Sequence, residues 1–254
     1  MKILGVETGG KRRHARAEPG TLAHLLERNA ALRDVFADDP DQRARLAELQ
    51  AWQSRRLMKS HDDLYRSPRY RLAVGFFLNE LYGGSDPRAR DRDLIKVQRV
   101  MEKLLPTEAL RAMCLAIELE VLSQELDAGV VRFLPVGPIT VDTYAVGYRG
   151  AGRRPDRERQ ILMMTEIGGY LDHVVGKPIV RALVRLARRP AHAAGFGLLQ
   201  DFLERGLEAF ETMHGADGFL TIIREREWRA MERLFAGTPD PFEFQSGARG
   251  VDAQ

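Results

Sequence analysis

The sequence has little of several features that would assign a protein to a functional class. Cys114 is the one cysteine among 254 residues, which excludes an intramolecular disulfide framework and a metal site built from cysteines alone. No run of about 18 apolar residues is present to span a bilayer, and the apolar stretch at residues 3–6 is too short for a secretory signal. Strand signals are also scarce. We therefore expect a cytoplasmic, helical protein.

The excess of positive charge lies in one short segment. The chain has a formal charge of +3 and a pI near 9.1, values that are typical of proteins with an anionic partner. Residues 1–20 hold five basic side chains against two acidic ones, which accounts for the whole excess, and the rest of the chain is neutral. We therefore predict a basic flexible tail over residues 1–20, and nucleic acid becomes a less favoured partner.

Apolar residues recur at spacings of three and four along most of the chain, a pattern typical of amphipathic helices. Caps, prolines and glycines divide this pattern into about eight to ten helices. The exception is residues 129–141, where two prolines predict a connector. The predicted fold is therefore all-α, a multi-helix bundle over residues 21–236 with a loose C-terminal tail at residues 237–254. It forms a single compact domain or two closely packed subdomains, divided near residues 129–155.

Glu80 lies in an unusual place for a carboxylate. The predicted helix Tyr70–Tyr82 is apolar almost all round, which is typical of a helix in the middle of a bundle. Burying a carboxylate without a partner is costly, so Glu80 should meet an arginine, a metal or a hydrogen-bond donor, or have a raised pKa. A structural pair with an arginine is the favoured interpretation, and a functional acid is the alternative.

A narrow polar track follows the predicted helix that begins at Glu108. Arg111, Glu118 and Glu125 are seven residues apart and lie between two apolar stripes. Carboxylate-bridged di-iron bundles use inward-facing glutamates of this kind, together with a Glu-x-x-His motif on each of two helices. The one Glu-x-x-His here ends at His214, where the imidazole is expected to cap carbonyl groups. Salt bridges to Arg111 or to neighbouring arginines are therefore favoured over a metal site.

Two histidines extend the metal hypothesis. His173 shares a helix face with Glu166, and His61 lies near the end of its predicted helix. Either imidazole could ligate a metal or a haem, although an isolated histidine is weak evidence and no haem-attachment, phosphate-binding or nucleophile-elbow motif is present. The expected cofactor is none. The alternative, a di-metal or haem site, would use Glu80, Glu118, Glu125, His173 and His61.

A stripe of arginines marks residues 177–189, which contain five basic side chains and no acid. Arg181, Arg185 and Arg188 lie at spacings of four and three, so one helix face carries all three, and we call them the arginine stripe. Guanidinium groups bind carboxylates and phosphates in bidentate geometry. The stripe could therefore bind an anionic ligand, nucleic acid or a partner protein, but pairing with the acidic helix that begins near Asp201 is the favoured interpretation.

Two stretches of the sequence carry a family resemblance. They are Phe76–Gly83 (FFLNELYG) followed by Arg90-Asp91, and Arg189–Gly195 (RPAHAAG) with Leu199–Glu204 (LQDFLE). Together they resemble an uncharacterised family of bacterial all-helical proteins with an FFLxxLYG signature, over residues 45–236. The resemblance implies an all-α fold of unknown function and supplies no catalytic residues.

These observations favour a protein that works by binding, with no catalysis of its own. The expected partner is another protein or a second copy of the chain. A metal- or haem-binding bundle is the first alternative. Binding of an anionic ligand or of nucleic acid through the basic tail and the arginine stripe is the second.

Overall fold

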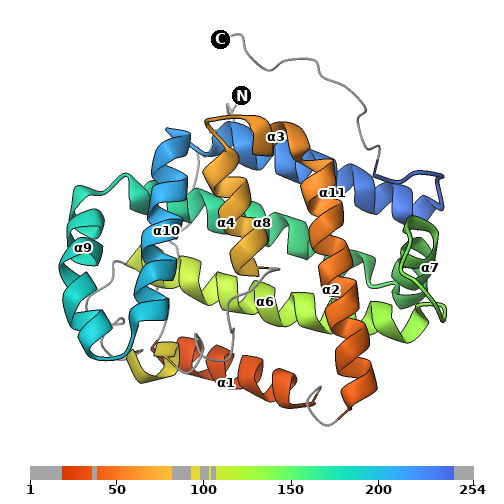
Figure 1. The fold of residues 1–254 in the computed structure, drawn as a ribbon, viewed down its shortest axis with the longest axis horizontal. Coiled ribbons are helices and arrows are strands. Elements are labelled where there is room, and N and C mark those ends of the chain that lie inside the picture. Colours follow the sequence, from red (N-terminus) through yellow and green to blue (C-terminus); the bar gives the residue numbers. More distant parts are fainter. Residues whose placement is uncertain (1–18, 36–38, 82–92, 98–102, 104–106, 243–254) are drawn as a thin grey trace, which may run out of the picture.

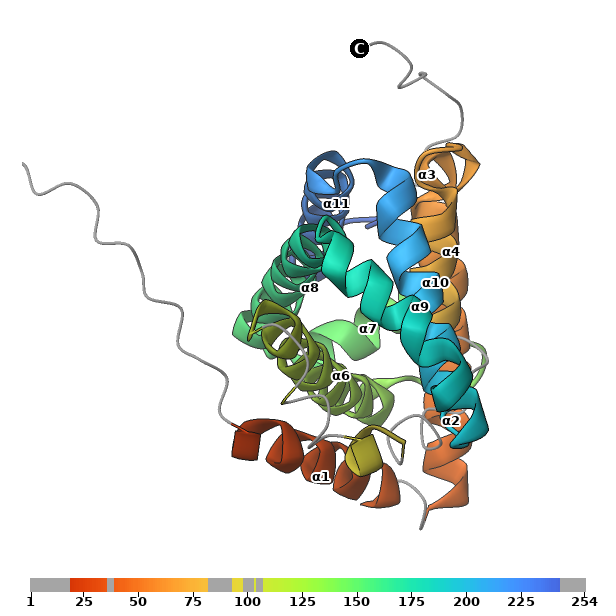
Figure 2. The same ribbon diagram turned by 90° about the vertical axis from the view of Figure 1, so that its left-hand side faces the viewer.

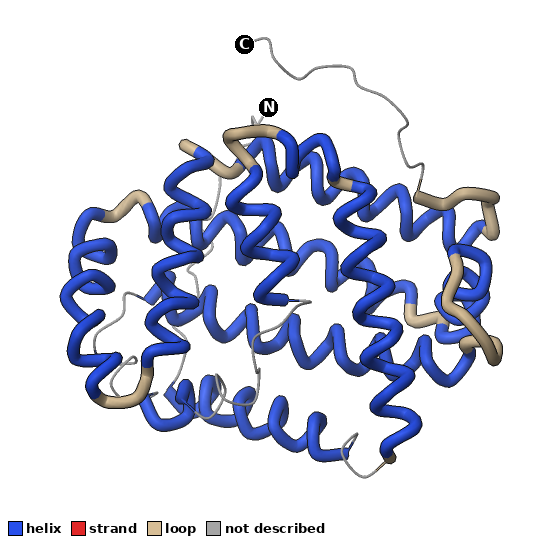
Figure 3. Tube along the Cα trace, viewed as in Figure 1, coloured by secondary structure: helices blue, strands red, loops and turns tan. Residues whose placement is uncertain are grey.

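A computed structural model describes residues 19–35, 39–81, 93–97, 103 and 107–242 of the chain. Every regular element within these ranges is a helix (Figure 3), which confirms the predicted all-α bundle. None of these helices is both long enough and apolar enough to cross a membrane. The helices are α1 Pro19–Val35, α2 Pro40–Ser60, α3 Asp62–Arg66, α4 Arg71–Leu81, α6 Thr107–Phe133, α7 Val141–Ala151, α8 Arg154–Val175, α9 Pro178–Ala193, α10 Gly197–Met213 and α11 Asp217–Ala236.

The helices form two layers that cross each other. α6, α8 and α11 run side by side in one layer, and α2, α4, α10 and α9 cross them in the other (Figure 1). Seen from the end, α11, α8 and α6 are stacked along one flank of the molecule, and α1 closes its lower edge (Figure 2). α8 is the middle helix of its layer because it packs against both α6 and α11. Helices from before and after residues 129–155 pack on each other, as α4 does on α10.

The hydrophobic core lies where the two layers meet. Near α7, Leu49 of α2 packs in one buried cluster with Val130, Tyr144 and Met231. A second cluster joins α4, α10 and α11 through buried aliphatic and aromatic side chains, Phe210 among them. Burial of these apolar side chains is the main favourable term that holds the layers together.

α6 is longer than its sequence predicts. We expect a connector from Gly129, but the helix continues to Phe133, so this expectation is wrong for the first five residues of the connector. Val130 is fully buried in the core, and this packing outweighs the low helix propensity of glycine and valine. The prolines then act as expected, because residues 134–140 form the loop before α7.

The boundary between α9 and α10 also differs from its expected place. The spacing predicts a helix from residue 191, with Gly195 inside it. α9 instead continues through Pro190 to Ala193, and Gly195 forms the turn with a φ of +83°. Glycine adopts this left-handed backbone at little cost, which is why the chain reverses here.

α7 lies close to the end of α6 because it carries glycines at the contact. A Cβ atom at Gly150 would lie 2.8 Å from both Cβ and Cγ of Phe133, and one at Gly147 would lie 3.0 Å from Cδ2 of Leu134. Both distances are shorter than an ordinary van der Waals contact between carbon atoms. The absence of side chains at these two positions therefore sets the distance between the helices.

Replacing Gly150 by alanine is expected to lower the free energy of unfolding by about 1–3 kcal/mol, because Phe133 or the whole of α7 must move. Gly169→Ala is a matched control, since nothing lies within 4 Å of a Cβ atom built at that exposed position of α8. The control should raise the free energy of unfolding by about 0.5–1 kcal/mol, because alanine favours a helix. Chemical denaturation measures both effects. If Gly150→Ala raised the free energy of unfolding as much as Gly169→Ala does, the close contact between α7 and Phe133 would be contradicted.

Candidate binding surfaces

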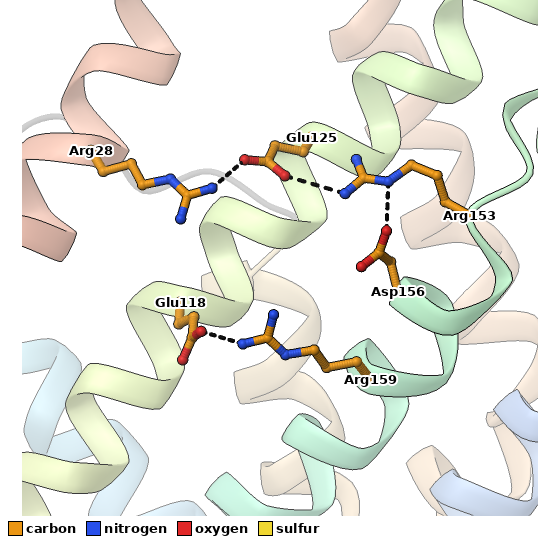
Figure 4. Close-up of polar contacts among 6 residues, drawn as sticks. All are labelled: Arg28, Glu118, Glu125, Arg153, Asp156 and Arg159. Carbon is orange, nitrogen blue, oxygen red and sulfur yellow. Dashed lines mark hydrogen bonds and ion pairs between the residues drawn. The ribbon is translucent and has the colours of Figure 1, made fainter.

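The polar track of α6 lies on the outer side of its layer and is paired with arginines. Glu118 accepts a hydrogen bond from Arg159 of α8, and Glu125 accepts one from Arg28 of α1 at 2.7 Å (Figure 4). Arg153, just before α8, reaches the other carboxylate oxygen of Glu125 at 3.4 Å. The two carboxylates are a third and a quarter exposed, so pairs of this kind contribute about 0–1 kcal/mol each. Their effect is to orient α1 and α8 on α6.

The described candidate metal ligands do not meet at one point. Glu118 and Glu125 each face arginines, His173 is exposed on α8, and His61 lies between α2 and α3. Within the described ranges, no group of three or more His, Cys, Asp or Glu side chains is placed to hold a metal ion. Glu80 belongs to α4, but its side chain lies outside the described residues.

His61 takes part in an almost fully buried ion-pair group with Arg56 and Glu227, whose side chains are 10% and 11% exposed; we call it the Glu227 cluster. Nη1 of Arg56 donates to both carboxylate oxygens of Glu227, at 2.7 and 2.8 Å. Nε2 of His61, a residue only 3% exposed, lies 3.0 Å from one of these oxygens. Burial alone would raise the pKa of Glu227, but the charge of Arg56 and the contact with His61 outweigh burial and lower this pKa to about 2. The Glu227 cluster therefore joins α2 to α11 through an ion pair whose carboxylate is ionised at neutral pH.

A second buried carboxyl group, Asp127 of α6, shows the opposite behaviour. Gln53 of α2 donates a hydrogen bond to Oδ1 of Asp127 at 3.0 Å. Burial raises the pKa of Asp127 above its ordinary value, although the charge of Arg157 and the bond from Gln53 act against this rise. Arg157 also lies 4.5 Å from the centre of the Tyr148 ring. Together with the Glu227 cluster, Asp127 places polar contacts inside the apolar interface between the layers.

Two grooves on the outer side of the α6–α8–α11 layer share one residue, Leu162. The first, of about 390 Å³, lies between α6 and α8, and the second, of about 460 Å³, lies between α8 and α11. Leu162 lines both and is 50% exposed. Leu115 and Met163 add apolar surface to the first groove, and Trp228 adds an aromatic ring to the second. We call the two grooves with Leu162 the outer face.

The two grooves of the outer face differ in charge. The first is acidic, because it carries three glutamates and one arginine. The second carries as many arginines as glutamates. Its arginines, Arg224 and Arg229, are exposed and form no ion pair with any residue in the described part of the chain. Exposed guanidinium groups of this kind can bind carboxylates of another molecule.

α9 presents a second surface, at the end of the molecule that faces the viewer in Figure 2. Ile179, Leu183 and Leu186 are 60%, 37% and 77% exposed, and Leu198 at the start of α10 is 60% exposed. Val180, on another side of α9, is buried, since this helix packs on α10 and α8. We call the four exposed aliphatic residues the α9 strip.

The arginine stripe is divided between internal pairs and solvent. Arg181 and Arg188 pair with glutamates of α10, as the charge pattern predicts. Arg185 and its neighbour Arg189 are exposed, and neither has an ion-pair partner in the ranges that the structure covers. Two of the three predicted anion-binding arginines therefore form ion pairs within the protein. Among the described residues of α9, Arg185 and Arg189 are the arginines without such a pair.

Sequence reasoning missed Glu227, although the sequence contains its signal. Ile223, Glu227, Ala230 and Leu234 follow one another at spacings of four, three and four, so the carboxylate lies within the apolar stripe of its helix. A charge in that position needs a buried partner of opposite sign. The partner, Arg56, comes from a helix far away in the sequence, and the spacing of residues gives no sign of it.

Comparison with protein-family models matches residues 32–241 to a family described as "Domain of unknown function (DUF8198)". The match covers most of the chain. The chain belongs to this family. Comparison with curated proteins and with solved structures gives no match. Membership of DUF8198 agrees with the resemblance to an uncharacterised family, while its FFLxxLYG signature and bacterial origin stay predictions.

The DUF8198 match ends one residue before a side chain that completes the core. Phe242 is buried, and its ring centre lies 6.1 Å from those of Trp52 and Tyr144. The guanidinium carbon of Arg56 lies 4.8 Å from the centre of the same ring. Phe242 therefore covers the Glu227 cluster at the end of the DUF8198 region.

Proposed function

We propose that the protein is a self-associating interaction protein with no catalysis of its own, and that two copies pair through the outer face. The observation that carries this proposal is the position of Leu162, an exposed apolar side chain between two grooves of different charge. The single cysteine supports a cytoplasmic location.

The outer face is suited to a partner identical to itself. Most homodimers have a two-fold axis, which places each surface patch opposite its symmetry mate. A two-fold axis that passes by Leu162 and runs parallel to α8 brings the two leucines together and lays the first groove of each copy on the second groove of the other. Trp228 then lies within the contact, and aromatic side chains are enriched in such interfaces.

The charges of the two grooves support this arrangement. With the axis at Leu162, Glu158 and Glu166 of the first groove face Arg224 and Arg229 of the second groove in the other copy. The two glutamates form only exposed intramolecular pairs, which are weak. The two arginines gain carboxylate partners on pairing, so opposite charges meet on both sides of the axis.

Replacing Leu162 by glutamate is expected to weaken self-association about 100-fold or more, because it removes a central apolar contact and places two carboxylates at the axis. Sedimentation equilibrium over a wide range of protein concentration measures the change. Leu186→Glu is the matched control, since it makes the same substitution on α9 and should leave self-association unchanged. A wild-type protein that stays monomeric throughout, or a Leu162→Glu protein that pairs like the wild type, contradicts the proposal.

A charge exchange tests the register of the two copies. The double variants Arg224→Glu/Arg229→Glu and Glu158→Arg/Glu166→Arg should each fail to pair alone, because like charges then face each other. An equal mixture of the two should form a mixed dimer, since every facing pair has opposite charges again. Absence of that mixed dimer contradicts the two-fold axis at Leu162.

A further inference from the structure

α9 lies in a long stretch of the chain that has no acidic residue of its own. Residues 173–200 contain no aspartate or glutamate. Of the basic side chains in this stretch, Arg185 and Arg189 have no ion-pair partner within the described residues. The α9 strip lies in the same stretch, so exposed aliphatic side chains and unpaired cations occur on one helix without a nearby acid in the sequence.

The strip and the unpaired arginines lie on adjoining sides of the helix. At about 100° per residue, Ile179, Leu183 and Leu186 form one exposed side of α9. Arg189 lies about 60° from Leu186, along the border of that side, and Arg185 lies about 40° farther around the helix. On the opposite border the helix meets α10, where Val180 is buried. The exposed part of α9 is therefore an aliphatic strip with a cationic edge.

We propose that the α9 strip binds the surface of an anionic lipid bilayer, with α9 lying in the plane of the interface. Helices that bind membranes in this way insert an apolar side below the headgroups and set lysine or arginine beside the lipid phosphates. Ile179, Leu183, Leu186 and Leu198 supply the apolar side. Arg185 and Arg189 supply the cations at its edge.

A lipid surface fits the strip better than a protein partner does. The strip is purely aliphatic, whereas the centres of protein interfaces are enriched in aromatic side chains, and typical interfaces contain about ten hydrogen bonds. A second copy docked strip to strip would bring Arg185 and Arg189 of both copies near each other. Residues 173–200 contain no acid to neutralise them, and Asp201, Glu204 and Glu211 of α10 already pair with His192, Arg188 and Arg181. A bilayer needs neither directional hydrogen bonds nor a shaped groove. This proposal is independent of self-association, which uses a different surface.

The test is sedimentation of the full-length protein with vesicles of phosphatidylcholine, with and without about 30% phosphatidylglycerol. We expect binding to the anionic vesicles alone, and a loss of binding as salt is added, because salt screens the attraction between charges. Arg185→Gln/Arg189→Gln should lower the partition coefficient about 30-fold, since each basic residue near an anionic surface contributes about a fivefold factor. Ile179→Gln/Leu186→Gln should lower it by about 100-fold or more through lost apolar burial.

Control substitutions remove two arginines and one exposed apolar side chain from another helix. Arg43→Gln/Arg55→Gln removes two exposed arginines from α2, and Met58→Gln replaces an exposed apolar side chain of the same helix. Both controls should bind anionic vesicles like the wild type. All of these proteins keep the basic residues 1–20, so a difference among them reports on α9 and not on the N-terminal charge.

Three results would overturn the proposal. The first is equal binding to neutral and anionic vesicles, or no binding to either. The second is a partition coefficient that is unchanged by the α9 substitutions. The third is binding of a polyglutamate peptide that depends on Arg185 and Arg189 while vesicles do not bind, which would assign the surface to an acidic protein segment.

Discussion

Replacing Glu227 by glutamine should lower the free energy of unfolding by about 3–5 kcal/mol, because it leaves the buried guanidinium of Arg56 without a counter-charge. In the wild type, one nitrogen of Arg56 lies within 2.8 Å of both carboxylate oxygens. His61 also loses its charged hydrogen-bond partner. Glutamine has almost the same shape as glutamate, so packing changes little and the loss reports on the charge.

Urea denaturation of the Glu227→Gln variant measures this loss, and two further variants define its origin. Glu225→Gln removes an exposed carboxylate two residues away and should change the free energy of unfolding by less than about 0.5 kcal/mol. Arg56→Met/Glu227→Leu removes both charges together and should cost less than Glu227→Gln alone, since no unpaired charge stays buried. A double variant as unstable as the single one contradicts this explanation.

The contribution of Glu227 to the free energy of unfolding should decrease as the pH falls. The pKa of Glu227 is lowered in the folded protein from its ordinary 4.5 to about 2, so the native state binds the proton less tightly than the unfolded state does. The stabilisation is complete above pH 4.5 and is lost as the pH falls toward 2. The difference in stability between wild type and Glu227→Gln should therefore narrow over this range. The raised pKa of Asp127 acts on both proteins and cancels in the comparison.

Replacing Phe242 by alanine should lower the free energy of unfolding by about 3–5 kcal/mol, the usual cost of removing a buried phenylalanine ring. The ring contacts Trp52 and Tyr144 and lies over the guanidinium of Arg56. Its loss opens a cavity in the core and exposes the Glu227 cluster to water. Part of the charge–charge attraction in that cluster should then be lost as well.

Thermal and chemical denaturation of Phe242→Ala measure this effect. Phe133→Ala is the matched control, because it removes the same ring from a position that is 52% exposed, and its cost should be less than half as large. If the two variants are equally stable, Phe242 does not contribute to the core. A double-mutant cycle with Glu227→Gln measures the coupling between the ring and the ion pair.

Most of the fold can be predicted from local sequence. Apolar spacing together with caps and prolines predicts the bundle, because these signals act within one helix. The errors concern where two helices, α6 and α9, end. Gly129 lies in a helix because Val130 fits the core, and Pro190 lies in one because the turn is made later, at Gly195.

The candidate sites are harder to predict from the sequence than the fold is. Spacing predicts that Glu118 and Glu125 share one side of a helix, but the arginines that pair with them come from α1 and from residues 153–159. The arginine stripe is predicted correctly as one helix face, while its division into paired and unpaired residues depends on where the glutamates of α10 lie. The grooves of the outer face join residues of three helices, and no local pattern contains them.

The polar contacts of α2 also restrict how the protein can fold. Gln53 and Arg56 are one turn apart, and they bind different helices, Asp127 of α6 and Glu227 of α11. If α2 slid by one turn, the apolar contacts could largely re-form, but both hydrogen-bonded pairs would be broken and a buried charge would be left alone. Misregistered packings of the two layers are therefore raised in free energy above the native one. That gap favours a single arrangement of the helices over a set of near-equivalent bundles.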